Sequence, residues 1–353
     1  MELKKVYSLI FILLSISVSA VNEEAILSKK PEKKLSEYEF FEDAIAQVPS
    51  ENVYPYILHS ALFSDYADKH RFVYVPKGKK AKFFPNEVYE FPVGSALVKT
   101  FSYPKALDGN RMLLETRLLL NQESGWIAHT YVWNQDQTEA YLKVTGHTHK
   151  SMAYFIDGEK KYVDYRVPNQ NQCKECHLKS GVIMPIGPKS RNLNFSIQYK
   201  EKIANQISYW MEKEIVESHM PLDLIVNWSD EAAPLNAKAR AYLDINCGHC
   251  HMPGGSADTT GLNLNLTETE NRKIGIYKKP VAAGRASEGM KFSIVPGSPE
   301  ESILLHRMDS LDPGVMMPES GRSLSHDEAA EMIRDWITPV SYTHLTLPTN
   351  REV

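Results

Sequence analysis

The stretch that organises this sequence is Asn246-Cys247-Gly248-His249-Cys250-His251, which follows an amphipathic segment beginning at Ala237. Its Cys-x-x-Cys-His spacing is typical of the covalent attachment of a c-type haem. The two thiols are spaced to form thioethers with the two vinyl groups of one porphyrin, and the next residue is placed to ligate the iron. The sequence therefore predicts Cys247 and Cys250 as haem-attachment residues and His251 as an iron ligand.

The same pentapeptide occurs earlier in the chain, as Cys173-Lys174-Glu175-Cys176-His177. One such match is a modest signal. The two copies together use all four cysteines of the chain, and a histidine follows each pair. We therefore predict two covalently bound c-type haems, the first on Cys173 and Cys176 with His177 as its iron ligand.

Three other uses of two Cys-x-x-Cys pairs compete with this interpretation. A shared zinc ion usually takes pairs separated by about 15–20 residues, whereas the gap here is several times longer, and zinc leaves the histidines unexplained. A thioredoxin-like pair needs a βαβ context and a thiol at the start of a helix, whereas Cys247 follows a helical segment. Two structural disulfides would close tight, strained loops. Haem attachment is the favoured interpretation.

The sixth iron ligand of the second haem is expected in the segment Gly314-Val315-Met316-Met317-Pro318-Glu319. A methionine thioether is a soft ligand that favours reduced iron and raises its potential. Met317 is the predicted ligand, because a Met-Pro pair just before the last helical segment is typical of cytochromes c. Met316 is the alternative, His306 is a weaker candidate, and both methionines could instead be core residues.

For the first haem the sequence leaves the sixth ligand undecided. Met184 follows His177 too closely to cross easily to the far face of a porphyrin. A five-coordinate iron is also compatible with the sequence. The histidines free to serve are His59, His70, His129, His147 and His149, of which the last two alternate near a loop.

The start of the chain has the features of a signal peptide, predicted over 1–20. Lys4 and Lys5 precede a short apolar run, and Val18-Ser19-Ala20 is a small-residue cleavage site. The run is too short to span a membrane comfortably. We therefore predict export, to the periplasm of a Gram-negative cell, with no membrane span in the mature chain. A formal net charge of −4 gives no electrostatic reason to bind nucleic acid.

The remaining pattern predicts an α+β fold class. Short segments rich in Val, Tyr, Phe and Thr, separated by turn residues, favour an antiparallel β-rich, sandwich-like domain over 70–196, which ends in the first haem motif. Residues 235–340 are predicted to form an all-α, class I cytochrome c-like domain. The other predicted parts are a leader and docking segment over 21–69, a connecting helix and linker over 197–234, and a non-native tail over 341–353 that resembles translated adapter sequence.

Four helices are predicted within these parts, the shortest of them over Glu300–Met308. Ile197–Val216 has apolar residues at near-helical spacing. Ala237–Asn246 leads into the second motif, and Ser325–Ile337 begins with Ser325 as its N-cap and Glu328 three residues later. We expect the Ala237–Asn246 and Ser325–Ile337 helices to cross. The predicted contact residues are Tyr242, Leu243, Ile333 and Trp336.

From about Pro92 to Ile337 the chain resembles a family of exported bacterial diheme c-type cytochromes. The segments that carry this resemblance are 115–117 (ETR), 131–134 (YVWN), 171–173 (NQC), 185–189 (PIGPK), 240–247 (RAYLDINC) and 312–314 (DPG). The resemblance implies two covalent haems and electron transfer, but no particular substrate.

These observations predict a periplasmic electron carrier that exchanges electrons with a redox partner protein, a periplasmic oxidoreductase. One alternative is a diheme peroxidase-like enzyme with one haem open to substrate, although its motifs would be farther apart and its first half less β-rich. A second alternative is a ligand- or partner-binding β module with an appended cytochrome. The aromatic residues compatible with that module are Tyr54, Tyr56, Trp126 and Trp133.

Overall fold

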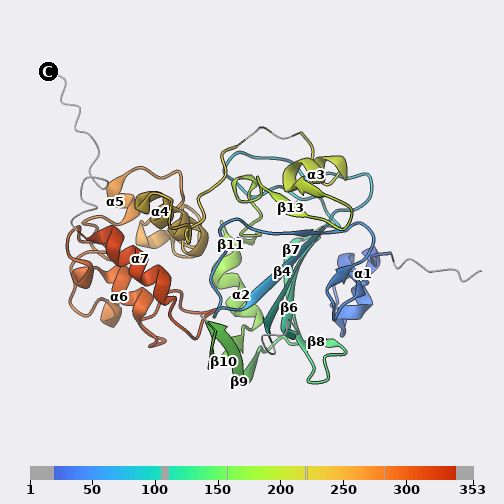
Figure 1. The fold of residues 1–353 in the computed structure, drawn as a ribbon, viewed down its shortest axis with the longest axis horizontal. Coiled ribbons are helices and arrows are strands. Elements are labelled where there is room, and N and C mark those ends of the chain that lie inside the picture. Colours follow the sequence, from blue (N-terminus) through green and yellow to red (C-terminus); the bar gives the residue numbers. More distant parts are fainter. Residues whose placement is uncertain are drawn as a thin grey trace, which may run out of the picture.

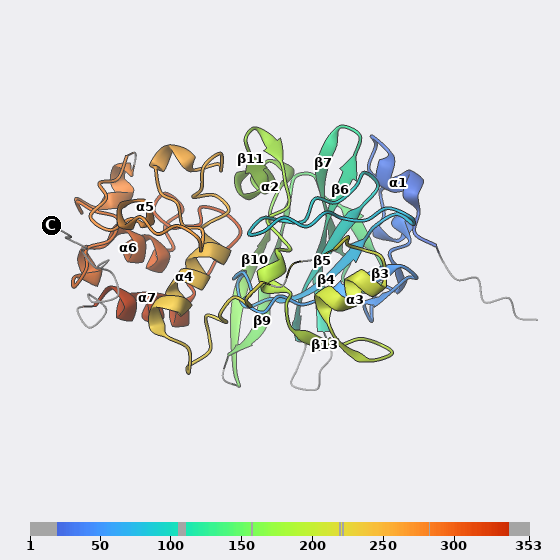
Figure 2. The same ribbon diagram turned by 90° about the horizontal axis from the view of Figure 1, so that it is seen from above.

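The computed structural model describes residues 20–104, 111–156, 158–218, 220, 222–281 and 283–338. Apart from Ala20, the predicted signal peptide lies outside these residues, and so does the predicted non-native tail. Figures 1 and 2 show a larger lobe built mainly of strands and a smaller lobe that begins with α4 (Leu235–Asn246) and ends with α7 (Asp327–Ile337). Within the described residues, no helix has the length and apolar character needed to cross a membrane.

A six-stranded antiparallel sheet forms the centre of the larger lobe. Every strand pairs with the next one along the chain, in the order β3-β4-β5-β6-β7-β8. Their runs of β-branched and aromatic residues favour extended backbone. The strands β4 to β8 confirm the strands predicted from about residue 70 onward, whereas β3 lies in the segment 21–69, where no strand was predicted. The strands are β3 (Val53–Tyr56), β4 (Asp68–Tyr74), β5 (Ala96–Pro104), β6 (Arg111–Gln122), β7 (Gly125–Trp133) and β8 (Ala140–Leu142).

Both faces of this sheet are covered, which explains the unbroken apolar run Leu118-Leu119-Leu120 in β6. Because side chains alternate along a strand, Leu118 and Leu120 lie on one face, in a core cluster with the N-terminal segment. That segment contains α1 (Glu23–Leu27), η1 (Leu35–Tyr38) and the hairpin of β1 (Phe41–Asp43) and β2 (Val48–Pro49).

Leu119 lies on the opposite face, beside a cluster that includes α3 (Gln206–Glu212). A second cluster on this face joins Phe101 of β5 to the hairpin of β9 (His147–Ile156) and β10 (Glu159–Val167). The helix α2 (Gln170–His177) packs beside β7 at the edge of the same region. One sheet face is thus reserved for the N-terminal segment, and the other supports the first Cys-x-x-Cys-His motif.

The predicted helix Ile197–Val216 is mostly wrong. Its first part forms a hairpin of β13 (Ser196–Gln198) and β14 (Ile203–Asn205), and only α3 is helical. The Asn205 side chain accepts hydrogen bonds from the backbone N–H groups of Ile207 and Ser208, so it caps a helix that can begin only at Gln206. Apolar spacing alone did not distinguish a helix from two short strands.

The predicted fold class is also wrong. Across the described residues, strand outweighs helix and the seven α-helices are short, so there is no all-α class I cytochrome c-like domain. The loops between α4 and α7 contain β-bridges, Ile276 with Ile294 and Phe292 with Ser302. The physical reason is the frequent proline and glycine between these helices, which stop helices early. In the larger lobe, one central sheet with small hairpins replaces the expected sandwich.

The smaller lobe is held by a core between its first and last helices. Tyr242, Leu243, Ile333 and Trp336 belong to one buried cluster, and Trp336 Nε1 donates to Asn236 Oδ1 at 2.9 Å. The predicted packing of these helices is confirmed, but the predicted cap is not, because α7 begins after His326 without a side-chain cap. The other helical elements of this lobe are α5 (Asn271–Ile274), α6 (Ile303–Asp309), η3 (Asp258–Thr260), η4 (Gly284–Ser287) and η5 (Pro299–Glu301).

Candidate haem site

The first motif forms the second half of α2. Asn169 caps this helix, because its Oδ1 accepts the N–H groups of Asn171 and Gln172 while Gln172 Oε1 accepts the Asn169 N–H at 3.0 Å. This reciprocal pair is a capping box. The helix contributes no fully buried residue, so its cysteines and histidine are partly accessible.

The second motif turns back on the end of α4. Cys247 is the C-cap of that helix, and its carbonyl oxygen accepts the N–H groups of Cys250 at 3.1 Å and His251 at 2.9 Å. Gly248 is required in this turn, since a Cβ there would lie 2.7 Å from the Asp244 carbonyl oxygen. The thiols of the second motif therefore sit against a firmly packed helix.

The two motifs face each other where the lobes meet. Cys250 Sγ donates to the Glu175 carbonyl oxygen at 3.3 Å, and Ser256 Oγ donates to the same oxygen. Just beyond the motifs, the Ser180 N–H donates to the Gly254 carbonyl oxygen at 2.7 Å. In Figures 1 and 2, α2 and β11 (Leu178–Lys179) lie on the side of the larger lobe that is next to the smaller one. Segments far apart in sequence thus form one site.

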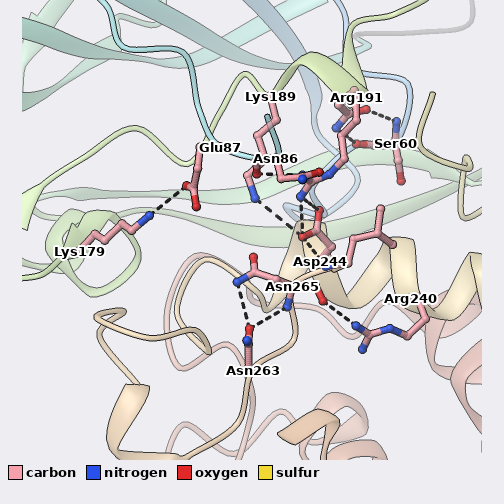
Figure 3. A network of polar contacts seen from close by, with 12 residues as sticks. Ser60, Asn86, Glu87, Lys179, Lys189, Arg191, Arg240, Asp244, Asn263 and Asn265 are labelled. Carbon is pink, nitrogen blue, oxygen red and sulfur yellow. Dashed lines mark hydrogen bonds and ion pairs between the residues drawn. The ribbon is translucent and has the colours of Figure 1, made fainter. Parts of the chain in front are cut away.

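A buried ion pair fixes α4 to the segment that follows the first motif (Figure 3). Arg191 Nη2 donates to both carboxylate oxygens of Asp244 at 2.8 Å, and Lys189 Nζ lies 3.8 Å from Asp244 Oδ1. The side chain of Asp244 is 0% exposed and that of Arg191 is 5% exposed. Burial alone would raise the pKa of Asp244, but Lys189 and Arg191 together hold it below its usual value. Asp244 is therefore ionised at neutral pH, three residues before Cys247.

Both motif histidines use Nδ1 for a hydrogen bond inside the protein. His177 Nδ1 lies 2.8 Å from the Met184 carbonyl oxygen, which can only accept, so Nδ1 carries the proton. His251 Nδ1 lies 3.1 Å from Thr260 Oγ1, whose own proton goes to the Ala257 carbonyl oxygen at 2.7 Å. His251 Nδ1 is therefore also the donor. In both imidazoles Nε2 keeps its lone pair, which is the state of a metal-binding histidine whose other nitrogen is anchored.

The charge state of these histidines agrees with that assignment. Burial lowers the pKa of His177 to about 4, against a smaller raising effect of its bond to Met184. Burial also lowers the pKa of His251. Both rings are therefore neutral at pH 7, as an iron ligand must be.

An apolar cavity lies beside the second motif and contains Met317. Cys247, His251 and Met317 line it together with aliphatic side chains from the loops and α6. Met316 is only 4% exposed and packs in the core rather than lining this cavity. His306 does not line it either, and its Nε2 lies 3.7 Å from Glu288. The geometry favours Met317 as the predicted sixth ligand over both rivals. The apolar lining residues are Leu262, Leu264, Ile274, Pro280, Val281, Ala283, Ile294, Ile303, Leu304 and Met308, and the cations are Lys278 and Arg307.

Another cavity, shared by both lobes, contains Cys173, Cys176 and His177. Most of the candidate sixth ligands for the first haem are engaged elsewhere. His70 and His149 form hydrogen bonds through Nε2 with Ser102 Oγ and the Leu114 carbonyl oxygen. His59 contacts the Phe195 ring at a tilt, and His147 contacts His149 edge-on. Met184 is 37% exposed.

His129 borders the same cavity, but its side chain points away from the first motif. His129 pairs with Leu118 across β6 and β7, and Leu118 belongs to the core cluster on the opposite face of the sheet. Because directly paired residues point to the same side, the imidazole of His129 turns to that face.

One residue that the sequence analysis missed is His249, inside the second motif. Ligand atoms of Cys176, His249 and Cys250 all lie within 4.8 Å of one another, and His249 Nδ1 is buried without a hydrogen-bond partner in the described structure. The Cys176 thiol, His249 and Ser256 lower the pKa of Cys250 by stabilising its thiolate. These three side chains could hold a metal ion in a chain without haem. Sequence spacing gives no signal for this group, because it depends on how the lobes meet.

Comparison of the chain with protein-family models, with curated proteins and with solved structures found no match. The resemblance to diheme cytochromes therefore stays a prediction from the sequence.

Proposed function

We propose that this chain is an electron-carrying c-type cytochrome with two covalently bound haems. Cys173 and Cys176 would attach one haem and Cys247 and Cys250 the other. His177 and His251 would ligate the irons, with Met317 as the sixth ligand at the second. When bound, haem supplies a one-electron redox couple.

The observation that carries this proposal is the matched state of the two motif histidines. Each anchors Nδ1 within the protein, keeps Nε2 free to bind, is neutral at pH 7 and lines a cavity beside its own cysteines. A pair of disulfides has no use for this arrangement. A zinc site could use histidines in this state, but it does not explain why a histidine directly follows each cysteine pair. At the second motif, the aliphatic wall around His251 and Met317 would exclude water and favour the reduced, less charged iron.

The test is a haem count on the purified, exported protein. A pyridine haemochrome assay should give two haems per chain, bound through thioethers and retained after acid extraction. One haem or none would overturn the proposal. Oxidised and reduced visible spectra would add the spin states, and an open high-spin iron would move the function from electron transfer to a peroxidase-like enzyme.

A second candidate function is the binding of a metal ion, and the observation that favours it is the Cys176–His249–Cys250 group. If these residues hold a structural or catalytic metal in place of haem, the purified chain should contain about one zinc, copper or iron ion and no porphyrin. His249→Ala is the discriminating variant. It should remove the metal from such a protein, whereas both haems of a cytochrome should stay attached, because their thioethers do not involve His249.

We further propose that the protein works outside the cytoplasm with a soluble oxidoreductase as its partner. The leader at 1–20 and the attachment of bacterial c-type haem outside the cytoplasmic membrane support this location. Cell fractionation should recover the haem-stained chain with periplasmic markers. Recovery with cytoplasmic markers would contradict it.

A further inference from the structure

Three cationic side chains form a row across the central sheet, next to the first motif. Arg71 of β4 lies opposite Lys99 of β5, which in turn lies opposite Arg117 of β6. Directly paired residues point to the same side of a sheet, and like charges in such pairs are destabilising. The row therefore needs an explanation beyond the folding of the sheet.

Only one of these three cations has an acidic partner in the described structure. Arg117 donates through Nε to Glu115 at 2.8 Å and through Nη2 at 2.5 Å. Lys99 Nζ has no hydrogen bond or ion pair there, and it lies 4.7 Å from the centre of the Phe101 ring.

Arg71 is the more deeply buried of the two cations that lack an acid. It is 7% exposed, its Nη1 donates to the Lys69 carbonyl oxygen at 3.3 Å, and its Nη2 is buried without a hydrogen-bond partner among the described residues. An unpaired buried charge is costly. Arg71 and Lys99 together thus leave two positive charges that call for a counter-ion.

The row lines a cavity that reaches the first motif. Arg71, Lys99 and Arg117 lie on one wall of it, and His177 also lines it. Lys99 and Arg117 extend into the neighbouring cavity that holds Cys173 and Cys176.

The opposite wall of this cavity adds more positive charge than negative. Lys189 and Arg191 share the single carboxylate of Asp244 there. Burial, with Arg71 and Arg117 adding to it, holds the pKa of Lys99 well below its usual value. A bound anion would act against this lowering and stabilise the charged form of the lysine.

We propose that this cavity is a carboxylate-binding site in which Arg71 and Lys99 provide the uncompensated charge. The guanidinium of Arg71 can bind a carboxylate through two parallel N–H groups, and Lys99 adds a point charge beside it. The carboxylate has two possible sources. One is the pair of propionates of the first haem, and this source rests on the proposed function. The other is a small free carboxylic acid that binds next to that haem.

The experiment uses the purified exported protein and the variants Arg71→Gln and Lys99→Met. Arg71→Lys and Lys99→Arg keep the charge, and Lys82→Met removes an exposed lysine from elsewhere on the surface as a matched control. Isothermal titration with succinate measures binding of a free carboxylate. Spectroelectrochemical titration measures the midpoint potential of each haem. Thermal unfolding checks that every variant is folded, and Lys99→Met is expected to fold because it removes one of three adjacent like charges.

A free-ligand site predicts saturable succinate binding that weakens at least tenfold in Arg71→Gln and Lys99→Met. The charge-keeping variants and Lys82→Met should retain it. A propionate site predicts no succinate binding, and a fall in the potential of one haem in both neutral variants while the other haem is unchanged. If succinate does not bind and neither haem potential shifts in the variants, the inference is wrong. The haem count reports separately on the proposed function, since a protein without haem could still bind succinate.

Discussion

The two Cys-x-x-Cys-His motifs share one spacing but occupy different surroundings. The first lies on α2, which has no buried residue, whereas the second follows α4, which has six. Three cations of the sheet line the cavity beside His177, whereas the cavity beside His251 is lined mainly by aliphatic side chains and Met317, with Lys278 and Arg307 as its cations. The comparison teaches that the pentapeptide sets only the attachment chemistry. The neighbouring elements set ligation, charge and the share of stability that depends on each motif.

The sharpest test of this difference compares Cys247→Ala with Cys173→Ala. Loss of attachment at Cys247 should destabilise the protein by more than about 5 kcal/mol, because the core of the smaller lobe surrounds that cavity. Loss at Cys173 should cost much less, because α2 buries little. Differential scanning calorimetry with a haem count on each variant measures both. Equal losses of stability would mean that the two motifs are not structurally distinct.

Trp336→Ala tests the core on which the second motif depends. Trp336 is 1% exposed and joins α7 to α4, so its removal should cost about 3–5 kcal/mol. Urea denaturation followed by circular dichroism gives this value. The matched aromatic change Tyr162→Ala, at a 61% exposed position on β10, should cost less than about 0.5 kcal/mol. A small effect at Trp336 would mean that α4 and α7 do not form a cooperative core.

Asp244→Asn tests the connection between the two motifs. It leaves the buried Arg191 without its counter-charge, which should cost about 3 kcal/mol at pH 7. The pKa of Asp244 is lowered in the folded protein. The ionised carboxylate therefore stabilises the fold fully above pH 3.8, the usual pKa of the group, and this stabilisation is lost as the pH falls through the lower pKa of the folded state. The wild type should therefore lose its advantage over Asp244→Asn in acid. Denaturation series at pH 7 and below pH 4 check this, and a constant difference would refute it.

Met317→His is expected to have the smallest effect in free energy. Replacing the thioether by an imidazole should lower the potential of the second haem by on the order of 0.1 V, which is ~2.3 kcal/mol per electron. In the oxidised protein, Met317→Ala should lose the weak near-infrared sulfur-to-iron band and Met316→Ala should keep it. The reverse pattern would make Met316 the ligand. Retention of the band in both variants would exclude both methionines.

Local patterns predicted the elements that depend on local interactions. The strands β4 to β8 and the helix α4 follow from alternation, turn residues and helical spacing close to one another in the chain. The hairpin of β13 and β14 was missed because its apolar residues also fit a helix, and the decisive cap of Asn205 is one side chain. The fold class of the last hundred residues was missed because short helices and loops are arranged there by tertiary contacts.

The residues of the candidate site fall into the same two groups, those that local sequence patterns predict and those that only the tertiary structure brings together. The cysteines and the two motif histidines could be read from spacing. Their anchors, Met184 and Thr260, could not, because the bonds depend on loop conformation. The row of three cations is only weakly indicated by the sequence, where Arg71, Lys99 and Arg117 are charged residues within mainly apolar strand segments. Only the register of three strands brings them side by side.

The turn at Gly248 has a consequence for how much the sequence of each motif can vary. The first variable position of the earlier motif, Lys174, is exposed and should accept almost any residue, including one that carries a spectroscopic label. The equivalent position of the later motif is closed, because a Cβ at Gly248 would meet the backbone of Asp244, which Arg191 holds in place. In a library of randomised variants, position 174 should therefore diversify freely while position 248 returns only glycine.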